Sequence, residues 1–167
     1  MTAQPRPLYA LPCIGWAAWR LLREREQGYP ARVEAGSMTQ EAADASLATS
    51  RAIVAQWRWA LDPRLPPLPE SFGADEAEMM EQVAQTLAWE RKRADARPAD
   101  LLLRERADLA ASLAWYQHAP PGAYSRIVVE MMADRRSRVR WFVPDPTVDA
   151  RYYRDLGLPL AAESEMG

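Results

Sequence analysis

Cysteine, histidine and lysine are nearly absent from this sequence. Cys13, His118 and Lys92 are the single residues of their types, so one chain cannot assemble a zinc cluster and cannot form an internal disulfide. Because no charged leader with a long apolar run opens the chain, we expect a reducing, cytoplasmic setting. Apolar runs of about 18 residues are also absent, which argues against a membrane-spanning helix.

Sequence motifs of catalysis are missing as well. The chain has no glycine-rich phosphate loop, no nucleophile elbow and no dinucleotide-binding fingerprint. His118 lies near a proline at the expected end of a helix, where a capping role suits it better than catalysis. Cys13 lies beside Ile14 and is most simply a small core residue. We therefore expect no catalytic residue, no metal and no cofactor.

A carboxylate-metal enzyme remains an outside alternative. Acids expected on adjacent helices could together hold a hard metal ion, namely Glu78, Glu81, Glu90, Glu105 and Asp108. No Glu-x-x-His pair accompanies them. A solvated acidic helix face explains these residues more simply.

What the sequence does contain is enough apolar material for a real core. The 167 residues are 49% hydrophobic and 26% charged, which suits one domain or two small ones. The formal net charge of -2 argues against a surface devoted entirely to nucleic acid, although it allows one locally basic patch.

Helical periodicity and capping signals predict an N-terminal helical hairpin over residues 1–62. Its first helix spans about residues 13–27 and is extended by a further turn up to Gly36. Ser37 or Thr39 can cap the second helix, whose apolar residues recur at helical spacing to the end of the hairpin.

Proline and a short turn divide the rest of the chain. Residues 63–73 hold four prolines and predict a semi-rigid linker. Residues 74–121 predict a second hairpin, because the short connection near residue 96 makes its two helices antiparallel. Residues 122–167 form a C-terminal segment, in which 126–143 is either a helix followed by an extended segment, which we favour, or a β-hairpin. The expected fold is mainly α, with two antiparallel helical hairpins, a Pro-rich linker and a small mixed or irregular C-terminal segment.

Two arginines fall inside the apolar stripes of the second hairpin. Arg91 and Arg106 need partners there, because a buried guanidinium is otherwise costly. With the turn near residue 96, Glu90 falls opposite Arg106, which predicts a structural ion pair between them. The functional alternative is that these arginines line an anion site.

The first helix carries a cluster of tryptophan and arginine. Four of its residues, at spacings of three and four, lie on one side of the helix and predict a surface that contacts a partner. This interaction face consists of Trp16, Trp19, Arg20 and Arg23. Core tryptophans with arginines laid over their rims are the stronger explanation.

A second basic and aromatic cluster lies at residues 135–142. Its spacing suits a phosphate-tracking patch with a stacking platform for nucleic acid, formed by Arg135, Arg136, Arg138, Arg140 and Trp141. A solvated turn or edge strand is the alternative.

Residues 29–54, YPARVEAGSMTQEAADASLATSRAIV, resemble a pattern found in small uncharacterised bacteriophage and prophage proteins. The resemblance rests on a Tyr-Pro, a Val-x-x-Gly, a Met-Thr start and an Ala-rich helix, carried by Tyr29, Pro30, Val33, Gly36, Met38, Thr39, Glu41, Ala42 and Ala52 to Val54. It implies a phage-like source and a helical hairpin, and it carries over no catalytic residue. Residues 63–167 lie beyond the match.

Together these patterns predict a non-enzymatic phage or prophage accessory protein that acts by macromolecular binding. A protein-interaction or inhibitor module, with a protein partner or self-association, is the first hypothesis. A nucleic-acid-associated factor that uses the patch at 135–142 is the alternative.

Overall fold

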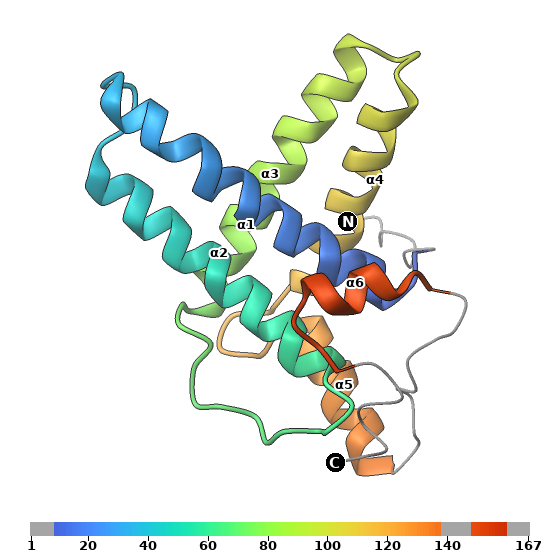
Figure 1. Ribbon diagram of the computed structural model, residues 1–167. Coiled ribbons are helices and arrows are strands. Elements are labelled where there is room, and N and C mark those ends of the chain that lie inside the picture. Colours follow the sequence, from blue (N-terminus) through green and yellow to red (C-terminus); the bar gives the residue numbers. More distant parts are fainter. Residues whose placement is uncertain (1–8, 138–147, 160–167) are drawn as a thin grey trace.

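The computed structural model describes residues 9–137 and 148–159. Within these residues the chain forms six helices and no strand, so the expected mainly α fold is confirmed (Figure 1). The helices are α1 (Leu11–Glu34), α2 (Gln40–Leu61), α3 (Glu76–Ala96), α4 (Leu101–Gln117), α5 (Arg126–Ser137) and α6 (Ala150–Asp155).

Helices α1 and α2 form the first hairpin. The helix expected over about residues 13–27 continues without a break through Pro30 to Glu34. The chain reverses at Gly36, whose φ of 77° lies in the left-handed region that glycine adopts without steric cost. Thr39 then caps α2, its side-chain oxygen accepting a hydrogen bond from the N–H of Ala42 at 3.1 Å. The turn expected between the two helices therefore forms the tip of this hairpin.

Helices α3 and α4 form the second hairpin, with Asp75 and Asp100 as their N-caps. The apolar spacing of this helix predicts a stripe of Met80, Val83, Ala84, Leu87 and Ala88, of which only Val83 and Leu87 are buried. The buried residues of this helix are Met79, Val83, Thr86, Leu87, Glu90 and Ala94. Two of these buried residues, Thr86 and Glu90, are polar, so hydrophobic spacing alone does not find the buried face.

One hydrophobic core joins the two hairpins. Its buried members come from every described helix. Trp57 of α2 is fully buried at the centre and meets the ring of Tyr116 of α4 edge-on, with centroids 5.6 Å apart. The hairpins expected at 1–62 and 74–121 thus share a single core within the described residues.

The Pro-rich linker is attached to this core along its length. The indole N–H of Trp59 donates to the carbonyl of Pro66 at 3.1 Å. Leu68 and Phe72 pack against the core cluster, and the ring of Phe72 meets that of Trp59 edge-on. The linker therefore holds the end of α2 in a fixed relation to the start of α3.

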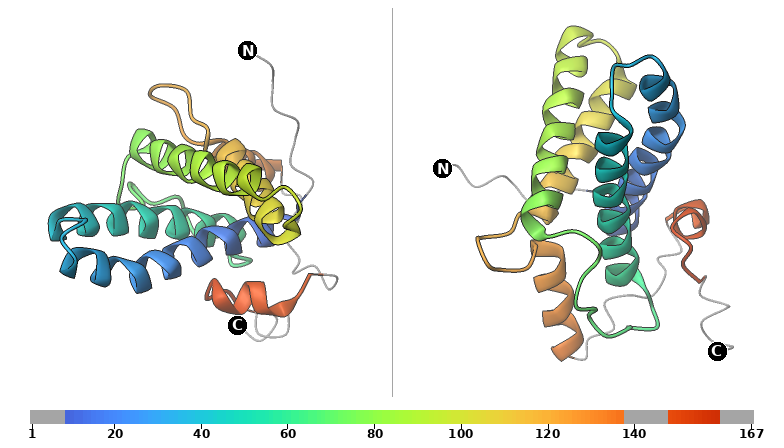
Figure 2. Two further views of the ribbon diagram at one scale, coloured as in Figure 1. Left: turned by 90° about the horizontal axis from the view of Figure 1, so that it is seen from above. Right: turned by 90° about the vertical axis from the view of Figure 1, so that its left-hand side faces the viewer.

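Helices α5 and α6 cover the end of the bundle that lies away from the hairpin turns (Figures 1 and 2). Residues 126–137 form a helix, as favoured from the sequence, and bury Ile127 and Val128. The extended segment expected after them, up to residue 143, lies outside the described residues. Helix α6 is capped by Asp149 and followed by Gly157, whose φ is 74°.

None of the described helices combines the length and the apolar character that crossing a membrane requires.

Two glycines of α1 have opposite surroundings and provide a test of the packing. A Cβ added at Gly15 would lie 3.0 Å from Leu61 Cδ1 and 3.2 Å from the ring of Trp57, both fully buried. A Cβ at Gly28 would meet nothing within 4 Å.

We expect Gly15→Ala to destabilise the protein by about 1–3 kcal/mol, because packed neighbours must move. Gly28→Ala is the matched control and should stabilise the helix by roughly 0.5–1 kcal/mol, because alanine has the higher helix propensity. Urea unfolding of both variants measures the difference. Equal effects of the two substitutions would contradict the close approach of α1 to α2 at Gly15.

A buried polar cluster lies where α2, α3 and α4 meet. The amide nitrogen of Gln117 donates to Gln56 Oε1 at 2.9 Å, and that of Gln56 donates to Glu76 Oε1 at 3.4 Å. Glu76 Oε2 is buried without a hydrogen-bond partner. Burial outweighs the hydrogen bonds to this carboxylate and raises the pKa of Glu76.

Because the folded protein holds this proton more tightly than the unfolded chain, stability contributed by Glu76 falls as pH rises through its folded-state pKa. We expect the stability of Glu76→Gln relative to wild type to increase between about pH 4 and pH 7, since glutamine carries no charge. Thermal melting across this range measures it, with Glu78→Gln on the exposed side of the same turn as control. A difference that does not change with pH would contradict this account.

Candidate functional site

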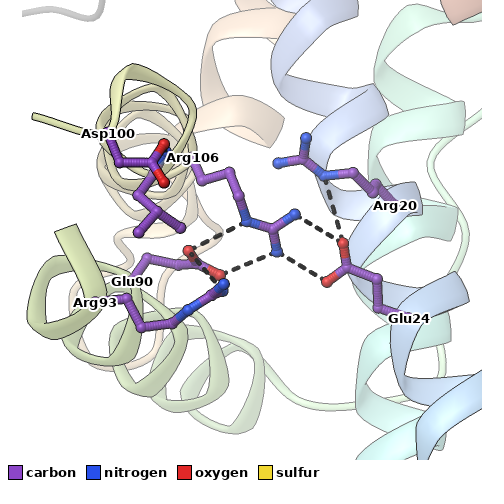
Figure 3. A network of polar contacts seen from close by, with 7 residues as sticks. Arg20, Glu24, Glu90, Arg93, Asp100 and Arg106 are labelled. Carbon is purple, nitrogen blue, oxygen red and sulfur yellow. Dashed lines mark hydrogen bonds and ion pairs between the residues drawn. The ribbon is translucent and has the colours of Figure 1, made fainter. Parts of the chain in front are cut away.

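Arg106 of α4 connects the two hairpins through two carboxylates (Figure 3). Its Nη1 and Nη2 donate to the two oxygens of Glu24 in α1, each at 2.8 Å. Its Nε and Nη2 donate to Glu90 of α3, at 3.3 and 3.1 Å. The predicted ion pair between Glu90 and Arg106 is therefore present, and Glu24 completes an arrangement that we term the Arg106 clamp.

Two further arginines surround the Arg106 clamp. Arg93 lies 3.6 Å from Glu90, and Arg20 lies 3.9 Å from Glu24. The hydrogen bonds that Arg106 donates lower the pKa of Glu24. The carboxylates of Glu24 and Glu90 in turn raise the pKa of Arg106 above its ordinary value. Burial lowers the pKa of Arg20, with the charge of Arg106 as the second cause. Because the side chain of Glu90 is only 4% exposed, it depends on Arg106 for compensation.

Above the Arg106 clamp the hairpins diverge toward their turns at residues 35–39 and 97–100 (Figure 1). A groove of about 650 Å³ lies between α1 and α3 beside the Arg106 clamp, within the size range of ligand-binding pockets. Its most exposed large apolar side chain is Trp89, at 59%. We term this feature the α1–α3 groove; its walls are formed by Leu21, Glu24, Arg25, Gly28, Tyr29 and Arg32 of α1, Gln85, Thr86, Trp89, Glu90 and Arg93 of α3, and Arg106 of α4.

The floor of the α1–α3 groove is a polar network centred on Arg25. Its Nη1 donates to Ser50 Oγ at 3.2 Å and to Gln82 Oε1 at 3.3 Å, and its Nη2 donates to Thr86 Oγ1 at 2.8 Å. Ser46 orients Gln82, because its carbonyl accepts from the amide nitrogen at 2.9 Å. These acceptors are all uncharged, so the network fixes the guanidinium without neutralising it.

Aromatic surface completes the groove. Tyr29 is held by a hydrogen bond between its hydroxyl and that of Ser46 at 2.8 Å, and the guanidinium of Arg32 lies 5.8 Å from its ring centroid. Trp89 stands on the opposite wall. The groove therefore offers two aromatic side chains and two arginines, Arg25 and Arg32, for which no carboxylate partner exists among the described residues.

The predicted interaction face on α1 is largely covered. The indole N–H of Trp16 donates to Asp155 of α6 at 2.8 Å, and its ring packs against Tyr152. The guanidinium of Arg20 lies over the Trp16 ring, at 5.1 Å, and Trp19 packs against the core. Of the four predicted residues only Arg23 is exposed, so this face holds α6 against α1.

The predicted nucleic-acid patch is only partly described. Arg135 is directed inward, where its guanidinium donates to the carbonyls of Trp59 and Pro66 and lies 4.1 Å from the centroid of the Trp59 ring. Arg136 is exposed. Arg138, Arg140 and Trp141 lie outside the described residues. Arg135 thus anchors α5 to the linker and is not free to meet a phosphate.

The remaining candidates have structural surroundings. Arg91 is exposed, so its placement in an apolar stripe is wrong; it belongs to the outer side of α3. Burial raises the pKa of the Cys13 thiol, which favours its protonated form. Among the described residues, no three His, Cys, Asp or Glu side chains are grouped so that they could hold a metal ion.

Comparisons with known proteins leave the family open. No family model, no curated protein and no solved structure matches this chain.

Sequence reasoning found one contact of this site and missed the groove. The signal for Glu24 was its position four residues after Arg20 on the same face of α1, which directs it toward the second hairpin. Trp89 is an aromatic residue on the side of α3 opposite the predicted stripe, where a tryptophan is unexpected. Arg25 and Tyr29 gave no local signal, because their partners are 17 to 61 positions away in the chain.

The Arg106 clamp predicts that loss of Arg106 is more destabilising than loss of the charge of Glu24. Arg106→Met should destabilise the protein by about 3 kcal/mol, because it leaves the buried charge of Glu90 with only Arg93 beside it. Glu24→Gln, at a side chain 44% exposed, should lose about 1 kcal/mol or less. Urea unfolding measures both variants, and a smaller effect at Arg106 than at Glu24 would contradict this arrangement.

Proposed function

We propose that this protein is a non-enzymatic binding protein that docks a segment of a partner protein in the α1–α3 groove. The observation that carries the proposal is the exposed indole of Trp89 within a groove whose floor is a fixed polar network. Tryptophan, tyrosine and arginine dominate the binding energy of protein interfaces, and all three line this groove.

Preorganisation supports the same function. The Arg106 clamp holds Glu24, Glu90 and Arg106 in place, and the network around Arg25 fixes a second cation, so little ordering remains when a partner docks. The groove is also bounded by α1 on one side and by α3 on the other, which suits a peptide segment better than an enclosed small molecule.

The proposed setting is the cytoplasm of a phage-infected or prophage-bearing bacterium. The resemblance of residues 29–54 to phage and prophage proteins supports this source. A small accessory protein in that setting acts by engaging a protein of the host or of the phage, for example as an inhibitor. Nucleic-acid binding through residues 135–142 is less favoured, because Arg135 is engaged with Trp59 and Pro66.

Selection from a library of displayed random peptides tests the proposed function. Peptides enriched on the wild-type protein should bind Trp89→Ala at least about ten-fold more weakly, which corresponds to about 1.4 kcal/mol. Leu101→Ala is the matched control, because Leu101 is 74% exposed on α4 and lies outside the groove lining. Peptides that bind both variants as well as wild type, or a selection without enrichment, would contradict docking in the groove.

A further inference from the structure

Arg25 is a fixed cation with unused donors. A guanidinium has five N–H groups, and the described structure assigns three hydrogen bonds to Arg25, all from its Nη atoms. The Nε–H and one Nη2–H therefore remain. The Nε atom is not among the buried nitrogens that lack a partner, so solvent reaches it, and Arg25 is one of the residues that line the groove.

The charge of Arg25 is also uncompensated. The neighbouring Glu24 is directed to Arg106, with both of its oxygens engaged at 2.8 Å. Ser50, Gln82 and Thr86 supply neutral oxygen atoms only. A partly buried guanidinium held by neutral acceptors gains from an anion that takes its remaining donors, and a planar carboxylate fits that fork.

The surroundings favour a carboxylate beside an apolar group over a nucleic acid. Four arginines and two glutamates line the groove, but Arg93 and Arg106 are engaged by Glu90 and Glu24. Arg25 and Arg32 are left, which is too few cations to follow a phosphate backbone. Thr86, which binds Arg25, lies three residues before Trp89, a rise of roughly 4.5 Å along α3.

We infer that the partner segment carries an aspartate or glutamate whose carboxylate binds Arg25, next to an aromatic or long aliphatic side chain that packs on Trp89 and Tyr29. This inference rests on the proposed function and specifies its ligand. The spacing along α3 places the acid and the apolar residue within four positions of each other in the bound peptide.

The peptides enriched on wild-type protein provide the first readout. They should contain Asp or Glu within four positions of Trp, Phe, Tyr, Leu or Met more often than the unselected library does. Enriched peptides that depend on Trp89 but lack this acid would overturn the inference and leave the proposed function standing. A library that yields no Trp89-dependent peptide would remove both.

A double-mutant cycle on one enriched peptide provides the second readout. Changing its acid to the amide should weaken binding to wild type about ten-fold, but should have little effect on binding to Arg25→Gln. Arg91→Gln is the matched control, because Arg91 is an exposed arginine outside the groove lining. Equal losses in wild type and Arg25→Gln would show that the acid does not contact Arg25, and would overturn the inference.

Two controls keep the test decisive. Arg25→Lys retains the charge but loses the planar fork, so it should fall between wild type and Arg25→Gln in affinity; an affinity below that of Arg25→Gln would count against a direct carboxylate contact. Thermal melting confirms that each variant is folded. A labelled single-stranded oligonucleotide is the competing probe, and Arg25-dependent binding of that oligonucleotide in preference to the acidic peptide would overturn the inference.

Discussion

The structure depends on one partly buried guanidinium. Arg106 reaches from α4 between Glu90 of its own hairpin and Glu24 of the other, and it makes two hydrogen bonds to each. Of the two ion pairs, Arg106–Glu24 connects the hairpins, whereas Arg106–Glu90 lies within the second hairpin and compensates a buried carboxylate. A charged contact at the edge of the core is directional, so it sets how far the hairpins open as well as holding them together.

The divergence of α1 and α3 beside the Arg106 clamp accounts for the groove. Two hairpins packed along their whole length would bury Thr86 and Trp89 of α3 against α1 equally. Instead Thr86 is buried and binds Arg25, whereas Trp89, one turn closer to the hairpin tip, is left exposed. The groove is therefore a consequence of the divergence of the helices. Within it, the charged side chain of Arg25 and the exposed indole of Trp89 line the same surface.

Local signals in the sequence predicted the elements of the fold, and one ion pair of the site. Capping at Thr39 and the glycine turn at Gly36 depend on neighbouring residues, so the elbow between α1 and α2 was predictable. The pair of Glu90 and Arg106 followed from hairpin geometry. The shared core and the groove were not predictable in this way, because they depend on how one hairpin meets the other. Arg25 illustrates the point: its three acceptors come from two other helices.

Arg106 sets the distance between the turns of the two hairpins. Double electron–electron resonance between spin labels at Ser37 and Arg97, one in each hairpin turn, measures that distance directly, with Cys13 replaced by serine to prevent labelling there. This account predicts one narrow distance distribution in the otherwise wild-type protein and a broadened or shifted one when Arg106→Met is added. The same narrow distribution in both proteins would contradict it, and would assign the geometry of the groove to the hydrophobic core alone.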